Sequence, residues 1–226
     1  MKKRMLALSM IVLITSMFFQ TCFASNYKVP TVTREYKFPD IYKWEKQRNG
    51  KDILVEHYAV REITQATNIK VISGYPDGTF RPDDDISREE FIKMLMVLAT
   101  NRTFDFESVD SNYTSWAGPY VTIAEMQGVI DKGAYTDETL KKPITRLEMV
   151  LMLSKTQIKM KGIPQNQIGS LVYTDISKLT DDEKDLLLHA VKYDLLEGMR
   201  DGTNRKFEPN KNLTRGEAAA ALMRIY

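Results

Sequence analysis

The sequence contains a single cysteine, Cys22, which lies in a segment that we expect the mature protein to lose. Basic residues at positions 2–4 precede an apolar stretch at 5–19, and small residues follow, so residues 1–24 have the pattern of a secretory signal peptide. The mature chain would then have no thiol. This excludes a disulfide, a cysteine-ligated metal and a cysteine nucleophile. A lipoprotein acylated at Cys22 is the alternative, although the residues before it do not form a lipobox.

Long apolar runs and an excess of positive charge are also lacking. Beyond the signal, no apolar stretch has the length of a membrane span. Three of the 32 basic residues lie in the signal, which leaves 29 basic and 30 acidic residues in the mature chain. Nucleic acids and anionic membranes both need a concentrated positive surface. We therefore expect neither as a partner. We expect a secreted protein that is located at the cell surface or in the cell wall.

Patterns typical of catalytic and metal sites are missing as well. His57 and His189 are the only histidines, and neither has a serine, carboxylate or metal-ligand spacing beside it. The acids around Asp77 and at 83–85 lack the EF-hand order, so turn chemistry explains them better than calcium does. Asp181 and Asp182 fit a solvated helix start rather than a glycosidase pair. We expect no enzyme activity, no metal and no cofactor.

One five-residue phrase occurs three times, at residues 86–90, 144–148 and 213–217. Each copy has the form of a capping box, in which a Ser or Thr hydroxyl accepts from an amide three residues later and a Glu reaches back. Each phrase should therefore begin a helix. The expected capping hydroxyls are those of Ser87, Thr145 and Thr214, and the expected capping carboxylates are those of Glu90, Glu148 and Glu217.

An arginine follows the capping residue in every copy, as Arg88, Arg146 and Arg215. The first helical position disfavours a cation by roughly 0.3–1 kcal/mol, so these arginines do not serve helix stability. One interpretation is that each packs its stem or pairs with an acid. The other is an anion site repeated at three helix starts, since free amides and a guanidinium together suit a carboxylate or phosphate.

The chain around these phrases divides into three similar units. Amphipathic helices are predicted near 56–70, from Trp116 and from Asp182, each followed by a loop and one copy of the phrase. A leader with the pattern aromatic-x-Asp-Ile occurs before the first and third units, at 38–41 and 173–176. A helix pair this small cannot bury its apolar faces alone, so the units should share one core, with a pseudo-threefold arrangement as the natural closed solution.

These observations set the expected boundaries. The units span residues 57–100, 104–160 and 172–226, preceded by an extended lead-in at 25–56 with turns at its prolines and at Asn49-Gly50. Compared with the third unit, the first has an insertion of about ten residues around positions 42–53. The function of this lead-in is not evident from its residues.

The loop from Gly74 to Pro82, of the form Gly-x-x-Asp-Gly-x-Phe-x-Pro, together with the repeated phrase, resembles the S-layer homology repeat. The resemblance covers residues 57–226. It implies an all-α fold, in which three helix-loop-helix repeats form a pseudo-threefold spindle with a shared helical core. It also implies a module that attaches exported proteins non-covalently to the bacterial envelope. We expect this module to be a monomer.

In Gram-positive relatives the implied ligand is an anionic secondary cell wall polysaccharide, often bearing pyruvyl ketals, held in grooves between repeats. The phrase arginines map to the residues that contact it, and the aromatic that opens the first helix maps to Tyr58 and Trp116. The full set of expected ligand-binding residues is Arg88, Arg146, Arg215, Ser87, Thr145, Thr214, Tyr58, Trp116, Gly74, Asp77 and Gly78.

Two departures make the repeats unequal. The third unit has Asp182 in place of the aromatic, and the second loop, 133–142, lacks the Asp-Gly-x-Phe sequence. We therefore expect one or two competent grooves, with ligand first at the first copy. The alternatives are an adaptor that holds a protein partner through residues 25–56 and an auxiliary subunit of a secreted enzyme, although 25–56 is too short for a catalytic core.

Overall fold

The computed structural model describes residues 38–47, 52–101, 104–163, 169–196 and 205–226. The chain separates into two compact units, residues 1–36 and 37–226, and all described residues belong to the second. The predicted signal at 1–24 and the first part of the lead-in lie outside the described residues. So does the turn predicted at Asn49-Gly50.

The described part of the lead-in is a β-hairpin, which the sequence analysis missed. A short 3-10 helix, η1 (Pro39–Ile41), leads into strands β1 (Tyr42–Lys46) and β2 (Asp52–Glu56). The strands are antiparallel, with Trp44 opposite Leu54. The insertion predicted near 42–53 therefore has a structure of its own, and the fold is mostly helical rather than strictly all-α.

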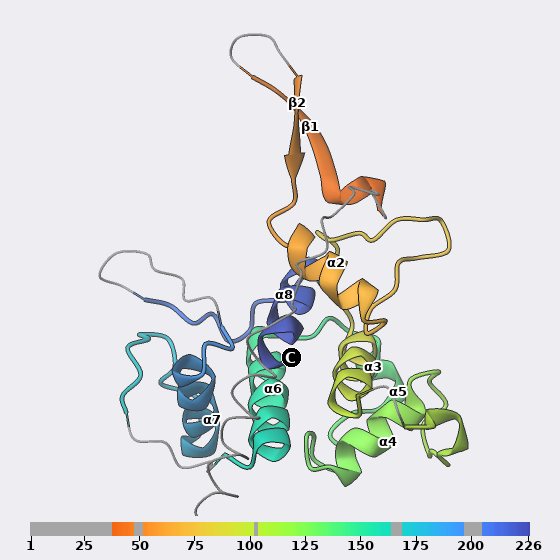
Figure 1. Ribbon diagram of the computed structural model, residues 1–226. Helices are drawn as coiled ribbons and strands as arrows, with labels where there is room; N and C mark the ends of the chain where they lie inside the picture. The colour runs from red at the N-terminus through yellow and green to blue at the C-terminus, as the bar shows by residue number, and fades with distance from the viewer. Residues whose placement is uncertain (1–37, 48–51, 102–103, 164–168, 197–204) are drawn as a thin grey trace, which may run out of the picture. The chain divides into compact units, whose positions relative to one another are not determined.

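The helices occur in the predicted order (Figure 1). They are α2 (Val60–Asn68), α3 (Arg88–Ala99), α4 (Gly118–Met126), α5 (Asp137–Leu140), α6 (Arg146–Lys161), α7 (Asp181–Lys192) and α8 (Arg215–Ile225), with a second 3-10 turn, η2 (Phe106–Ser108). The short helix α5 lies within the divergent second loop and was not predicted. Its own capping box, made by Thr136 and Thr139, explains why the chain turns there.

The three predicted capping boxes are confirmed. The hydroxyl of Ser87 accepts from the backbone N–H of Glu90 at 3.2 Å, and the Glu90 carboxylate accepts from the backbone N–H of Ser87 at 3.0 Å. The same reciprocal pair begins α6 and α8. Caps of this kind stabilise a helix start by roughly 1 kcal/mol each. All three helices begin at the phrase arginine, as expected.

A closed ring of backbone hydrogen bonds joins the three phrases. The N–H of Ile86 donates to Leu213 O at 3.0 Å, Leu213 N–H donates to Ile144 O at 3.2 Å, and Ile144 N–H donates to Ile86 O at 3.0 Å. The three side chains are fully or almost fully buried. Each phrase thus gives one hydrogen bond to one neighbour and receives one from the other.

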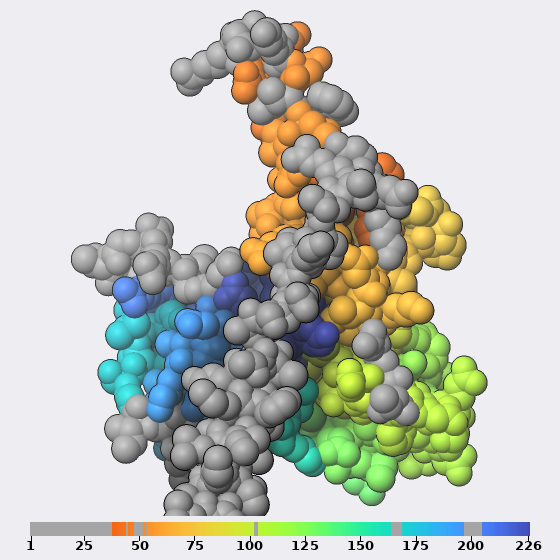
Figure 2. Space-filling view, in the orientation of Figure 1, coloured from red at the N-terminus to blue at the C-terminus, as the bar shows by residue number. Residues whose placement is uncertain are grey.

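Helix packing follows the same cyclic order. The first helix of each unit packs on the second helix of the unit before it: α4 on α3, α7 on α6, and α2 on α8. Figure 1 shows α6 beside α7, and in Figure 2 the orange surface of the first unit borders the blue surface of the last helix. Helices α3, α6 and α8 also contact one another. One apolar core therefore serves all three units.

Each loop is fixed by one buried apolar side chain, and the leaders clamp two of the loops. Phe80, Leu140 and Phe207 are fully buried, which stabilises each loop by roughly 1.5–3 kcal/mol. In the third unit, Asp175 accepts from the backbone N–H groups of Phe207 and Glu208, both at 2.8 Å. Asp40 does the same in the first unit. The leader aspartates thus position the loops that precede the phrases.

Candidate functional site

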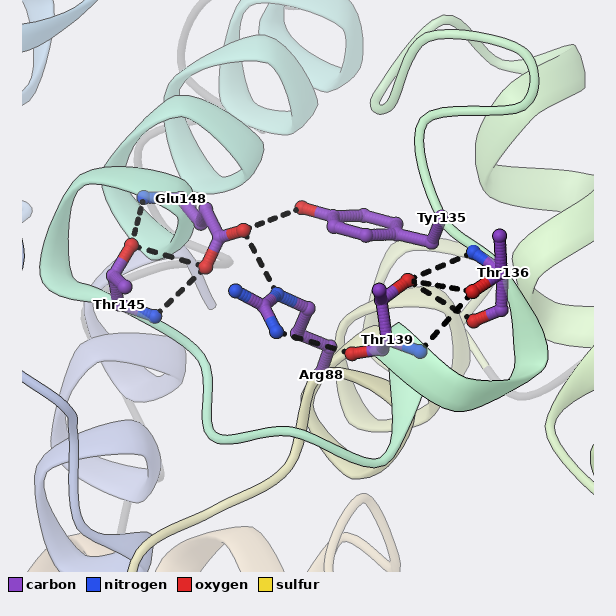
Figure 3. A network of polar contacts seen from close by, with 6 residues as sticks. All are labelled: Arg88, Tyr135, Thr136, Thr139, Thr145 and Glu148. Atoms are coloured by element: carbon purple, nitrogen blue, oxygen red, sulfur yellow. Dashed lines mark hydrogen bonds and ion pairs between the residues drawn. The ribbon is translucent and has the colours of Figure 1, made fainter.

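The arginine of the first phrase connects two units. Nε of Arg88 donates to Oε1 of Glu148 at 2.8 Å, and Nη1 donates to the backbone O of Thr139 at 3.0 Å (Figure 3). The same carboxylate oxygen accepts from the hydroxyl of Tyr135 at 3.1 Å. Glu148 therefore caps α6 with one oxygen and binds the other two side chains with its second oxygen. The sequence left two interpretations of Arg88 open, an acid partner and an anion site. This contact with a carboxylate corresponds to the first of them.

Burial fixes the direction of the Tyr135 hydrogen bond. Partial burial raises the pKa of Tyr135, and the negative charge of Glu148 raises it further. The hydroxyl therefore stays protonated in neutral solution and donates to the carboxylate. The guanidinium carbon of Arg88 lies 5.5 Å from the centre of the Tyr135 ring, within the range of a cation–π contact.

Arg215 makes an equivalent but more buried connection. Nη1 donates to Oε1 of Glu90 at 3.0 Å, Nε donates to Phe80 O at 3.0 Å, and Nη2 donates to Ser73 O at 3.3 Å. Tyr75 also donates to Oε1 of Glu90, at 3.2 Å. Only 3% of the Arg215 side chain is exposed. All three of its nitrogens thus bind protein oxygens, and the side chain joins the start of α8 to the first unit.

The third interface is built differently. The carboxylate oxygen Oε1 of Glu217 accepts from Nζ of Lys211 at 2.8 Å, a contact with a lysine of its own unit. Arg146 is half-buried, and its guanidinium carbon lies 5.7 Å from the centre of the Phe207 ring. The three phrase arginines are therefore not equivalent in their surroundings.

A cavity of about 270 Å³ opens at this third interface. Tyr58 of the first unit and Arg146 of the second both line it, together with residues of the third. Three basic side chains and one acidic side chain face it, the basic ones being Arg146, Lys211 and Arg224. Tyr58 is 62% exposed, and its ring packs on His57 with centroids 4.3 Å apart. The predicted aromatic and one predicted arginine thus meet here, and the pair is Tyr58 with Arg146 rather than with Arg88.

A second, smaller cavity of about 130 Å³ is lined by residues of all three units. Trp116, Gly74 and Arg215 line it, with Lys93 as its other basic side chain and Glu90 as its acid. The indole Nε1–H of Trp116 donates to Oε1 of Glu89 at 3.1 Å. Glu89 is buried and also accepts from the Ser115 hydroxyl at 2.5 Å. This contact holds the exposed indole in one orientation beside the cavity.

The predicted loop residues Asp77 and Gly78 form a tight turn. Asp77 accepts from the hydroxyl and backbone N–H of Thr79, at 2.6 and 2.9 Å, and pairs with Arg81 at 2.7 Å. These contacts, the Thr79 hydrogen bond first, lower the pKa of Asp77. Gly78 has a φ of 83°, which favours glycine. Both residues are exposed and neither lines the Trp116 cavity, whereas Gly74 does.

The capping hydroxyls of Ser87, Thr145 and Thr214 all accept from backbone amides at the helix starts. Sequence reasoning did not single out several residues that line the cavities or fix their aromatics. These are Glu89, Lys93, Lys211, Arg224, Tyr75 and Tyr135. Glu89 lies in the first turn of α3, where an acid is common and is easily read as solvated, although here it is buried.

Two kinds of feature are absent from the described residues. Within them, no cluster of three or more histidine, cysteine or acidic side chains has an arrangement that would hold a metal ion. None of their helices combines the length and apolar character needed to cross a membrane.

Comparison with known proteins gives a family match at two segments. Residues 54–92 and 189–219 match the family model of the S-layer homology domain. The first segment contains α2, the loop and the start of α3, and the second contains the end of α7 and the start of α8. Both segments end within a helix that begins at one of the three phrases, the first in α3 and the second in α8.

Curated relatives match over larger parts of this chain. It is 30% identical to cell surface glycoprotein 1 of Acetivibrio thermocellus over 166 residues, which are 68% of this chain and 7% of that protein. It is 32% identical to the cellulosome-anchoring protein of the same organism over 117 residues, 47% of this chain and 25% of that protein. The amylopullulanase of Thermoanaerobacterium thermosulfurigenes is 25% identical over 187 residues, 82% of this chain and 10% of that protein. The chain spans a quarter or less of each of these relatives.

Proposed function

We propose that this chain, which carries S-layer homology domain sequence at residues 54–92 and 189–219, attaches to the bacterial cell wall by binding an anionic wall polysaccharide. The observation that carries the proposal is the Tyr58 cavity, where an exposed aromatic ring and three basic side chains from different units meet. An aromatic face suits the apolar face of a sugar, and the cations suit a carboxylate. The names of the cell surface and cellulosome-anchoring relatives support attachment at the envelope.

We further propose that the three units, 57–100, 104–160 and 172–226, form a pseudo-threefold spindle. The ring of hydrogen bonds among Ile86, Ile144 and Leu213 and the cyclic packing of the helices support this arrangement. In a spindle, each groove is built from all three units: one supplies the loop, one the arginine and one the aromatic. The Tyr58 and Trp116 cavities both have this composition.

We propose that the wall polymer carries pyruvyl ketals. We also propose that the protein acts as a secreted monomer without enzyme activity. A pyruvyl ketal adds one carboxylate to a sugar that otherwise has no charge. A cavity with an excess of basic side chains and a volume of about 270 Å³ suits such a group better than a neutral glycan. The same cavity has no arrangement of paired carboxylates that would cleave a glycosidic bond.

Binding to purified wall sacculi tests the function. The protein, lacking residues 1–24, should sediment with sacculi and lose most of this binding when the secondary polymer is stripped chemically. High salt should weaken the binding, because exposed charges are screened. Equal binding before and after stripping would contradict a polysaccharide ligand. Alanine at all three phrase arginines is a poor test, because Arg215 is buried and its loss should unfold the protein.

The hairpin supports one alternative, an adaptor that holds a protein partner at the wall. Strands β1 and β2 pair only with each other, so within the described residues each has an unpaired edge that another strand can join. Deleting residues 42–56 should leave binding to sacculi intact under either function. Loss of a co-purifying wall protein on this deletion would favour the adaptor.

A further inference from the structure

The last turns of α3 and α6 and the chain just after α4 border a further cavity, of about 200 Å³. We call it the Thr156 cavity. It lies at the helix ends opposite the phrases and shares no lining residue with the Tyr58 and Trp116 cavities. Its wall is largely apolar, because it includes the side chains of Met96, Ala99, Val129 and Met160.

The hydroxyl of Thr156 is buried and has no hydrogen-bond partner among the described residues. Only 2% of this residue is exposed. The buried polar residues on either side of it in α6 do have partners. Ser154 donates to Leu186 O at 2.9 Å, and Gln157 lies 2.9 Å from Nε2 of His189. Since buried hydroxyls are almost always hydrogen-bonded in native proteins, the exception at Thr156 needs a physical reason.

Other helical threonines of this chain satisfy their hydroxyls locally. Thr64 donates to Val60 O at 2.7 Å, and Thr100 donates to Met96 O at 2.9 Å. In both cases the acceptor is the carbonyl four residues earlier in the same helix, which one of the two common threonine rotamers reaches. Thr156 does not make this bond. Its hydroxyl is therefore available to a molecule in the cavity that its side chain lines.

The positive charge beside this cavity already has a partner. Nζ of Lys159 donates to the backbone O of Gln127 at 2.9 Å, which ties the end of α6 to the end of α4. A neutral ligand therefore suits the site better than an anion. Water is a poor occupant of a largely apolar cavity, because a buried water needs about two to four polar partners.

We infer that the Thr156 cavity binds a small neutral ring compound that bears one hydroxyl group, and that the Thr156 hydroxyl pairs with the hydroxyl of this ligand. An apolar cavity of roughly 150 Å³ holds a benzene ring, so about 200 Å³ leaves room for a substituent. Met160 is 47% exposed, and its flexible side chain can adapt to a ligand that enters. The inference goes beyond attachment to the cell wall and does not depend on it.

Methionine-methyl NMR with phenol as the probe tests the inference, because the methionines report on different cavities. Met96 and Met160 line the Thr156 cavity, whereas Met149 lines the Tyr58 cavity and Met94 lines the Trp116 cavity. Phenol should shift the methyl signals of Met96 and Met160 and leave the other two in place. Toluene, a ring of similar size without a hydroxyl, is the second probe, and titration gives the affinity of each.

Three variants separate the hydroxyl from the cavity. Thr156→Val replaces the hydroxyl with a methyl group, so it should bind phenol at least about fivefold more weakly and bind toluene as the unmodified chain does. Thr64→Val removes a hydroxyl from α2, which does not line the cavity, and should change neither affinity. Ala99→Leu adds volume at the cavity wall and should abolish the shifts caused by both probes.

Weaker phenol binding in Thr156→Val, with toluene binding retained, supports the inference, and retained toluene binding also shows that the variant is folded. Equal losses for both probes in that variant, or no loss for either, would overturn the pairing with Thr156. Signals of Met96 and Met160 that do not move with either probe would overturn the site as a whole. So would phenol binding that persists unchanged in Ala99→Leu.

Discussion

Nη1 of Arg215 lies 3.0 Å from Oε1 of Glu90, although 125 residues separate the two in sequence. The arginine begins the last helix and the glutamate caps α3, so the pair joins the third unit to the first. Arg88 and Glu148 make the corresponding contact between the first and second units, at 2.8 Å. The capping boxes of α3 and α6 therefore have two tasks: one carboxylate oxygen of the glutamate caps its own helix, and the other binds the arginine of another unit.

Replacing Arg215 with methionine should lower the free energy of unfolding by about 3–5 kcal/mol. The substitution keeps most of the packing volume but leaves the Glu90 carboxylate without its guanidinium. Urea denaturation measures the change. Arg81→Gln breaks an exposed pair with Asp77 and should leave the urea midpoint nearly unchanged. A double-mutant cycle with Glu90→Gln should give a coupling of at least about 1 kcal/mol, and additive effects would show that the pair is not coupled.

Removing the Tyr135 hydroxyl tests the second connection. Tyr135→Phe should destabilise the protein by about 1–3 kcal/mol, because the hydroxyl donates to the ionised Glu148 carboxylate. Tyr75→Phe removes the matching hydrogen bond to Glu90 and should have a similar effect in urea denaturation. A change near zero for both would mean that the arginines alone satisfy these carboxylates.

The free energy of unfolding should decrease as the pH is lowered through the mildly acidic range, because of His189. Its side chain is buried between α6 and α7, with Nε2 2.9 Å from Oε1 of Gln157. Burial lowers the pKa of His189 below 6.5, and Lys192 lowers it further. The unfolded chain therefore binds a proton more readily than the folded one, so this stability is present above about pH 6.5 and is lost as the pH falls below that value.

Thermal melts between about pH 7 and pH 5 measure this effect. The decrease in melting temperature should be smaller in His189→Gln, because glutamine takes no proton. Asp77, Asp137 and Asp175 also have lowered pKa values, but they stay ionised in this window and lose their contribution only at more acidic pH. An identical pH dependence in His189→Gln would show that His189 does not cause the acid sensitivity.

Trp116 offers an optical test of the ligand site. Replacing Trp44, the other tryptophan, with phenylalanine leaves Trp116 as the one indole in the chain. If the wall sugar binds at the Tyr58 cavity, as proposed, saturation with a methyl hexoside that bears a pyruvate ketal should leave this emission nearly constant. A large shift or quench would place the ligand at the Trp116 cavity instead.

The orientation of the Trp116 indole should depend on Glu89. Glu89→Gln should change the emission of Trp116 before any ligand is added, since the buried carboxylate accepts its Nε1–H. Glu107→Gln, which removes an exposed acid from η2, is the matched control and should leave the emission unchanged. Equal spectra for all three proteins would show that Glu89 does not hold the indole.

The repeated phrase predicted the helix starts because capping is a local property. Ser87 and Glu90 are three residues apart, so the sequence contains everything that the box requires. The sequence does not reveal which acid each arginine binds, because Arg88 and Glu148 lie 60 residues apart. Arg88 also begins α3, and Glu148 also caps α6. The sequence raised an acid partner as one interpretation of a single arginine, and the structure gives Arg88 and Arg215 such a partner.

The second loop shows why motif comparison alone was incomplete. It lacks the Asp-Gly-x-Phe sequence, yet Leu140 is fully buried like Phe80 and Phe207. Helix α5 brings Leu140 into that position through a capping box made by two threonines, Thr136 and Thr139. Similarly, the hairpin at 42–56 was missed because polar residues and prolines around it favoured a loop, and pairing of two short strands depends on contacts that a single strand does not reveal.

The cyclic packing of the helices limits how many units this fold can hold. In an open array of helical repeats, the first and last units each leave one face without a neighbour, and another unit can be added there. Here α2 of the first unit covers α8 of the last, so neither unit has such a face. A duplicated or deleted unit would therefore have to break the packing of α2 on α8.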